Sequence, residues 1–117
     1  MKNFKEIATE FVTKYPAMFD TDKWFWINQL EMLLETNSAK EISPETFKML
    51  YKLRYSANES CAQTAKRILS GQTTIETELK YSGGFMSSVL KGETDLAFAK
   101  ADIGNHYALS KRLEDLP

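Results

Sequence analysis

The chain has 117 residues, 43% of them hydrophobic and 26% charged, and a formal net charge of −1. This length and composition are typical of one soluble domain with a shared core, and the near-zero charge argues against a protein that coats nucleic acid without specificity. No apolar run approaches the roughly 20 residues that span a bilayer, and the first residues lack the features of a signal peptide, so we expect a cytoplasmic protein without membrane contact.

The first predicted helix covers residues 4–15, where hydrophobic residues recur every three or four positions and line one face. Asn3 and Glu6 form a capping box at its start. Pro16 ends the helix, because a proline disfavours helical backbone at the residue before it.

The second predicted helix starts at Asp20 or Thr21, and its apolar residues extend beyond one stripe. Such a helix is either central to the fold or covered by a partner. The predicted core face consists of Trp26, Ile27, Leu30, Leu33 and Leu34. Three further large side chains fall on other faces of this helix: Trp24, Phe25 and Met32.

The third predicted helix starts at Ser43, which serves as its cap, with Pro44 at the first helical position. A second capping box, Ser56 with Glu59, leaves open whether residues 44–70 form one helix or two. Gly71 supplies the C-terminal stop.

The last third of the chain predicts further short helices. Residues 73–81 alternate between polar and apolar residues as a strand does, but no second strand pattern exists to pair with them. Thr73 and Glu76 form a capping box, so we expect a short helix over residues 72–79. A helix over residues 83–91 follows. After Gly92 a final stretch reaches Leu116, and the pair Gly104-Asn105 either breaks it or marks close packing. The chain is therefore predicted to be all-α, with five to seven helices.

Residues 81–93, with the sequence YSGGFMSSVLKGE, contain a serine cap, an apolar pair, a serine, an apolar residue, and a glycine followed by a charge. These positions are Ser82, Phe85, Met86, Ser87, Val89, Gly92 and Glu93. Upstream, Gln72 and Ile75 supply the polar start and the apolar anchor of a first helix of the motif. The segment 72–93 resembles the helix-turn-helix of the lambda-repressor/Cro-like family, with Lys80 standing where that family usually has glycine in the turn.

The resemblance implies a helix-turn-helix-like half, residues 56–117, that shares one core with an aromatic-rich helical layer, residues 1–55. It also implies a small non-enzymatic regulator that binds double-stranded DNA as a dimer, with its recognition helix at the base edges and cations at phosphates. The helical spacing leaves Ser87 and Ser88 outward. The implied DNA contacts are Gln72, Thr73, Ser87, Ser88 and Lys91, with Lys66, Arg67 and Lys80 at phosphate.

Ten of the 14 aromatic residues lie in residues 1–55. Aromatic residues and methionine form protein cores and are also enriched at the centres of protein interfaces. We expect most of them to form the core, and Trp24, Phe25 or Met32 to be presented to a second chain, as in a homodimer. The alternative function is therefore a protein-binding adaptor or inhibitor, for example a phage or mobile-element product that blocks a host complex.

One constellation invites a catalytic interpretation. Asp102, His106 and Ser110 are spaced by four residues and would share one helix face. A working triad needs side chains that converge on a pocket beside an oxyanion site, which a single helix face does not provide. A lone histidine and the lone cysteine, Cys61, cannot supply a metal site. We therefore expect no enzyme activity and no cofactor.

Overall fold

The computed structural model describes residues 2–19, 22–38 and 43–116, and in these ranges the chain forms eight α-helices, one 3₁₀-helix and no strand. The prediction of an all-α protein is confirmed. The predicted number of helices is too low, because the stretch after Gly92 is divided between two α-helices and the 3₁₀-helix. Within the described ranges, no helix combines the length and the apolar character that a membrane span requires.

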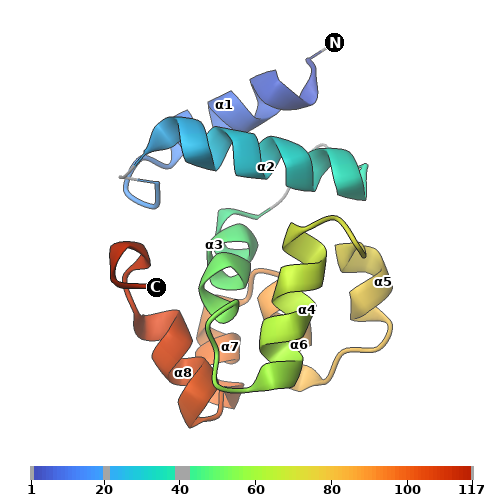
Figure 1. Cartoon of the computed structure of the whole chain (residues 1–117), viewed down its shortest axis with the longest axis vertical. Coiled ribbons are helices and arrows are strands. Elements are labelled where there is room, and N and C mark those ends of the chain that lie inside the picture. The colour runs from blue at the N-terminus through green and yellow to red at the C-terminus, as the bar shows by residue number, and fades with distance from the viewer. Residues whose placement is uncertain (1, 20–21, 39–42, 117) are drawn as a thin grey trace.

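Helices α1 (Phe4–Lys14) and α2 (Lys23–Asn37) lie side by side as one layer above the rest of the molecule (Figure 1). Asn3 caps α1 as predicted, because its Oδ1 accepts a hydrogen bond of 2.8 Å from the backbone N–H of Glu6. Helix α2 is capped by Asp22. The start expected for it, Asp20 or Thr21, lies outside the described residues.

Helix α2 is central to the fold, as its apolar composition predicts. Helix α1 contacts one side of it, and α4 (Glu59–Leu69) contacts it from the lower layer. The predicted core face is confirmed, because all five of its residues are buried: Trp26, Ile27, Leu30, Leu33 and Leu34.

Aromatic rings join this upper layer to α3 (Pro44–Leu53) in the lower layer. The Trp26 ring lies 5.6 Å from the rings of Phe19 and Phe47, and 4.8 Å from the ring of Tyr51. Tilted and edge-to-face ring pairs of this kind contribute about 0.5–1.5 kcal/mol each beyond the area that they bury. Much of the aromatic content of the first half of the chain therefore holds the two layers together.

Residues 44–70 form two helices, α3 and α4. Helix α3 begins as predicted, with Ser43 as the cap and Pro44 in the first turn. The second helix is capped by Asn58, whose Oδ1 accepts a hydrogen bond from Cys61 N, and not by Ser56. The hydroxyl of Ser56 instead donates to the side chain of Asn105, far along the chain.

The lower layer is completed by four short α-helices and the 3₁₀-helix: α5 (Ile75–Leu79), α6 (Gly84–Leu90), α7 (Thr94–Lys100), α8 (Ile103–Ser110) and η1 (Leu113–Asp115). Helix α3 contacts α4, α6 and α8. The buried hydroxyl of Thr46 in α3 donates to the carbonyl of Val89 at 3.0 Å and so ties α3 to the end of α6. Residues of both predicted halves contribute to one hydrophobic core, from Ala8 in α1 to Leu109 in α8.

The pair Gly104-Asn105 marks close packing and does not break the helix. The break lies two residues earlier, because α7 ends at Lys100 and α8 begins after its cap, Asp102. A Cβ atom added to Gly104 would lie 2.7 Å from the Cβ of Ala57. Glycine at this position therefore allows α8 to approach the loop between α3 and α4.

Candidate functional site

The segment that resembles a helix-turn-helix, residues 72–93, folds as α5 and α6, with residues 80–83 between the two helices. Both short helices are shorter than the predicted ranges 72–79 and 83–91. Thr74, and not Thr73, caps α5, because its hydroxyl accepts the hydrogen bond from Thr77 N. Helix α6 starts after Gly83, which has no side chain with which to cap it.

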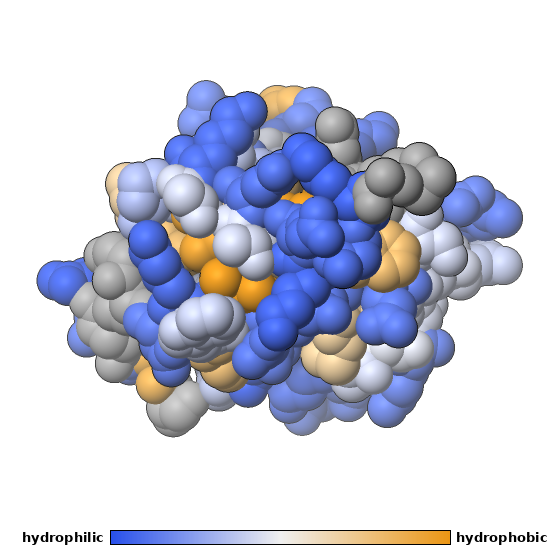
Figure 2. Space-filling view, turned by 90° about the horizontal axis from the view of Figure 1, so that it is seen from above, coloured by the Kyte–Doolittle hydropathy of each residue, from blue (hydrophilic) through white to orange (hydrophobic). Residues whose placement is uncertain are grey.

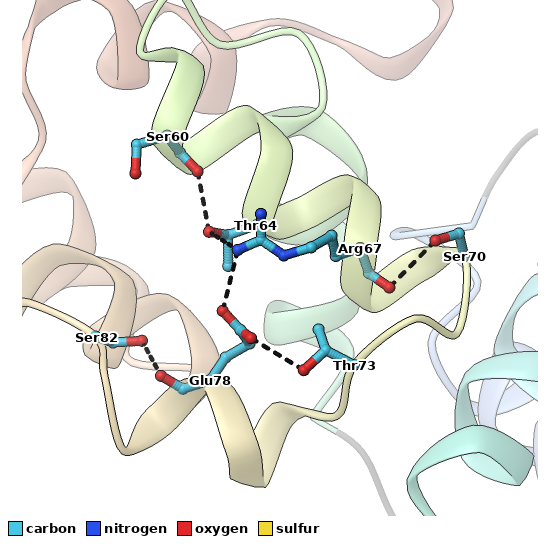
Figure 3. Close-up of polar contacts among 7 residues, drawn as sticks. All are labelled: Ser60, Thr64, Arg67, Ser70, Thr73, Glu78 and Ser82. Carbon is cyan, nitrogen blue, oxygen red and sulfur yellow. Dashed lines mark hydrogen bonds and ion pairs between the residues drawn. The ribbon is translucent and has the colours of Figure 1, made fainter.

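A polar network fastens α5 to α4 (Figure 3). The Arg67 guanidinium donates to Glu78 Oε1 at 3.3 Å and to the Thr64 hydroxyl at 3.1 Å. The Thr73 hydroxyl donates to the other carboxylate oxygen of Glu78 at 2.9 Å. Two of the implied DNA contacts, Arg67 and Thr73, are therefore engaged within the molecule, where they position α5.

The expected outward position of Ser88 is wrong. Ser88 is 3% exposed, and its hydroxyl donates to the carbonyl of Gly84 at 3.0 Å. The physical reason is that α3, α5 and α7 all contact α6 and cover more than one of its faces. Ser87 is half-buried, whereas Gln72, before α5, is exposed.

Exposed lysines surround α6. Lys80 precedes the helix, Lys91 follows it, and both are exposed, as is Lys66 on α4. In the part of the chain that the structure describes, no carboxylate forms an ion pair with any of these three. Lys100 is not among the predicted contacts, but its Nζ lies 3.6 Å from the position that a Cβ of Gly84 would occupy. No local spacing predicts this contact, because α7 has to fold back onto α6 to make it.

A second candidate surface is the outer side of α2. The three large side chains expected on its other faces are exposed: Trp24 (68%), Met32 (39%) and Phe25 (38%). Trp24, Asn28 and Met32 are spaced by four residues and form one stripe along the helix. Seen from above in Figure 2, the α1–α2 layer shows hydrophobic surface near its centre, surrounded by hydrophilic side chains.

The side chains of Asp102, His106 and Ser110 on α8 do not form a catalytic triad. The Ser110 hydroxyl lies 3.3 Å from His106 Nδ1. The carboxylate of Asp102 is used elsewhere, since it accepts hydrogen bonds from the backbone of Asn105 at 2.7 Å and from the Asn58 amide at 3.1 Å. These hydrogen bonds lower the pKa of Asp102 and identify it as the cap of α8.

The Cys61 thiol is half-buried against the core. Burial raises its pKa, although the Asn105 amide lies 3.6 Å from the sulfur and favours the thiolate. A thiol with a raised pKa is a poor nucleophile at neutral pH. Among the described residues, no three histidine, cysteine or acidic side chains are grouped so that they could hold a metal ion.

Comparisons of the chain with protein-family models, with curated proteins and with solved structures found no match. The function is therefore inferred from the outer side of α2 and the lysines around α6.

Proposed function

We propose that this protein acts by binding another protein through the outer side of α2. The observation that carries the proposal is the exposure of Trp24, of which 68% is open to solvent at the start of the most apolar long helix. Tryptophan is among the residues that contribute most to binding energy at protein interfaces. Phe25 and Met32 extend the apolar surface along the same helix.

The charges beside this surface indicate the chemistry of the partner. Glu31 and Glu35 lie one turn apart on α2, and the helical spacing places both next to the stripe that contains Trp24 and Met32. Complementary charge directs encounter and excludes wrong partners. A protein surface with an apolar pocket and basic groups at its rim fits this face, and the protein would act as an adaptor or inhibitor that occludes that surface.

The test compares proteins retained by the immobilised chain and by two variants, followed by titration of the purified partner. Trp24→Ala is expected to weaken binding about 30-fold or more, because truncation of a hot-spot side chain costs about 2 kcal/mol or more. Tyr81→Ala is the matched control, since Tyr81 is an exposed aromatic residue far along the chain, beside α5. A partner held equally well by the wild type and Trp24→Ala would show that the outer side of α2 is not the interface.

A second candidate function is binding to double-stranded DNA, and it is favoured by the lysines around α6. Lys80 precedes this helix, Lys91 follows it directly and Lys100 lies beside its first residue, and cations beside a recognition helix contact phosphates. The resemblance of residues 72–93 to the lambda-repressor/Cro-like family points to the same helix. Ser88 is not among the contacts of this proposal, because it is buried.

For DNA binding, we expect the affinity for duplex DNA to fall about 40-fold between about 50 and about 200 mM salt, as three phosphate contacts predict. A Ser87→Glu, Lys91→Glu variant should abolish binding. The matched control is Lys5→Glu, Thr9→Glu, which makes the same charge change at the same spacing on the exposed side of α1. Equal loss of binding in both variants would indicate a nonspecific charge effect, and no binding by the wild type at low salt would exclude the DNA function.

A further inference from the structure

Helix α8 presents an outward stripe whose residues are exposed to solvent, although the His106 ring also packs edge-on against Phe98 of α7. Ile103 is 91% exposed, and Tyr107, one turn later, is 61% exposed. The opposite side of the helix packs against the core through buried Ala108 and Leu109. The outward stripe has the spacing of a helix face that is buried in most proteins, and it consists of Ile103, His106, Tyr107 and Ser110.

The two ends of this stripe carry opposite charges. Asp102 lies at the N-terminal end and lines the same shallow hollow as Ile103 and Tyr107. Lys111 lies at the C-terminal end, where its Nζ is 5.2 Å from the centre of the Tyr107 ring. The face is therefore negative at one end, apolar in its middle and positive at the other end.

We propose that the α8 faces of two copies of this chain pack against each other in antiparallel orientation around a two-fold axis. This orientation brings Asp102 of each copy to the partner's Lys111. The midpoint between these residues falls between His106 and Tyr107, so the two-fold axis passes through the middle of the stripe. The same face thus serves both copies, as a two-fold symmetric interface requires.

The small area of the α8 face determines how strongly two copies are expected to associate. Helix α8 has eight residues, and two such helices bury less than the roughly 1,200 Å² that marks a stable specific interface. We therefore expect a weak dimer, with a dissociation constant on the order of 100 µM. The inference is independent of the proposed function, since Trp24, Phe25 and Met32 belong to a different helix.

The test is sedimentation equilibrium of the full chain from about 10 to about 500 µM, the range around the expected dissociation constant. The wild type should approach the dimer mass at the highest concentrations. Ile103→Glu should weaken association about tenfold or more, because each copy loses its most exposed apolar side chain from the interface and has to desolvate a carboxylate instead. Glutamate is favourable in the first turn of a helix, so the fold of this variant should be intact.

Leu96→Glu is the matched control, since Leu96 is also an exposed apolar residue in the first turn of a short helix, α7. It should dimerise as the wild type does. Asp102→Asn keeps a capping side chain but removes the charge, and should weaken association about two- to fivefold and reduce its dependence on salt.

Two results would overturn the proposal. One is a wild type that stays monomeric over the whole range, as it would if the face binds a different protein. The other is a dimer that Ile103→Glu leaves unchanged, which would place the interface elsewhere. If Ile103→Glu fails to fold, Tyr107→Ser replaces it, and a Tyr107→Ser variant that dimerises as the wild type does would equally contradict the proposal.

Discussion

Replacement of Trp26 by alanine is expected to lower the free energy of unfolding by about 3–5 kcal/mol. The Trp26 ring is buried and contacts four other aromatic rings. Its removal would leave a cavity where the α1–α2 layer meets α3. Because a domain of this size is stable by only about 5–15 kcal/mol, urea unfolding should show a large shift of the midpoint.

A second tryptophan in the same helix, Trp24, provides a direct control. Trp24→Ala removes the same side chain two positions away, but from a site that is 68% exposed. We expect it to change the free energy of unfolding by less than about 0.5 kcal/mol, as surface substitutions generally do. Equal effects of the two substitutions would contradict the arrangement of α2, in which Trp26 faces α3 and Trp24 faces solvent.

Gly92→Ala is the second substitution with a large expected effect, a loss of about 2–4 kcal/mol of unfolding free energy. Gly92 follows α6 and has a φ of +75°, a conformation that disfavours residues with a side chain. A Cβ atom at this position would collide with the Ser43 hydroxyl and would lie 3.2 Å from the Thr46 hydroxyl. Ser43 caps α3 and Thr46 bonds to the end of α6, so displacing either side chain would disturb the contact between these helices.

Urea unfolding of Gly71→Ala separates the backbone cost of a positive φ from the steric cost of the added Cβ. Gly71 has a similar φ, +82°, but the nearest atom to an added Cβ is a side-chain hydroxyl oxygen of Thr36 at 3.2 Å. The backbone cost of about 1–2 kcal/mol should then remain with little steric addition. A Gly92→Ala variant no less stable than Gly71→Ala would show that the approach of Ser43 to Gly92 is looser than described.

The candidate binding surfaces lie on separate helices, and this makes the functional tests independent. The protein-binding surface belongs to α2, the lysines surround α6, and the self-association face belongs to α8. A variant of Trp24 leaves the lysines untouched, and a variant of Lys91 leaves the outer side of α2 untouched. A loss of one activity with retention of the others would therefore assign that activity to one helix.

Several features of this protein are determined by short stretches of its sequence. The caps at Asn3 and Ser43 and the proline after α1 act through residues at most four positions away. The inner face of α2 follows from hydrophobic spacing, because a long apolar helix has one arrangement that buries its leucines. Such local interactions can be predicted from the sequence without knowing how the helices pack against one another.

Only the tertiary structure decided which side chains around α6 are exposed to solvent and free of contacts within the molecule. Ser88 is buried, Arg67 is paired with Glu78, and Lys100 lies beside Gly84, although none of these contacts follows from local spacing. A helix of seven residues is too short to have a single obvious inner face, so the helices packed around it determine its exposure. The same reason explains the exposure on α8: its other side packs against the core through Ala108 and Leu109, and Ile103 and Tyr107 lie on the side away from it.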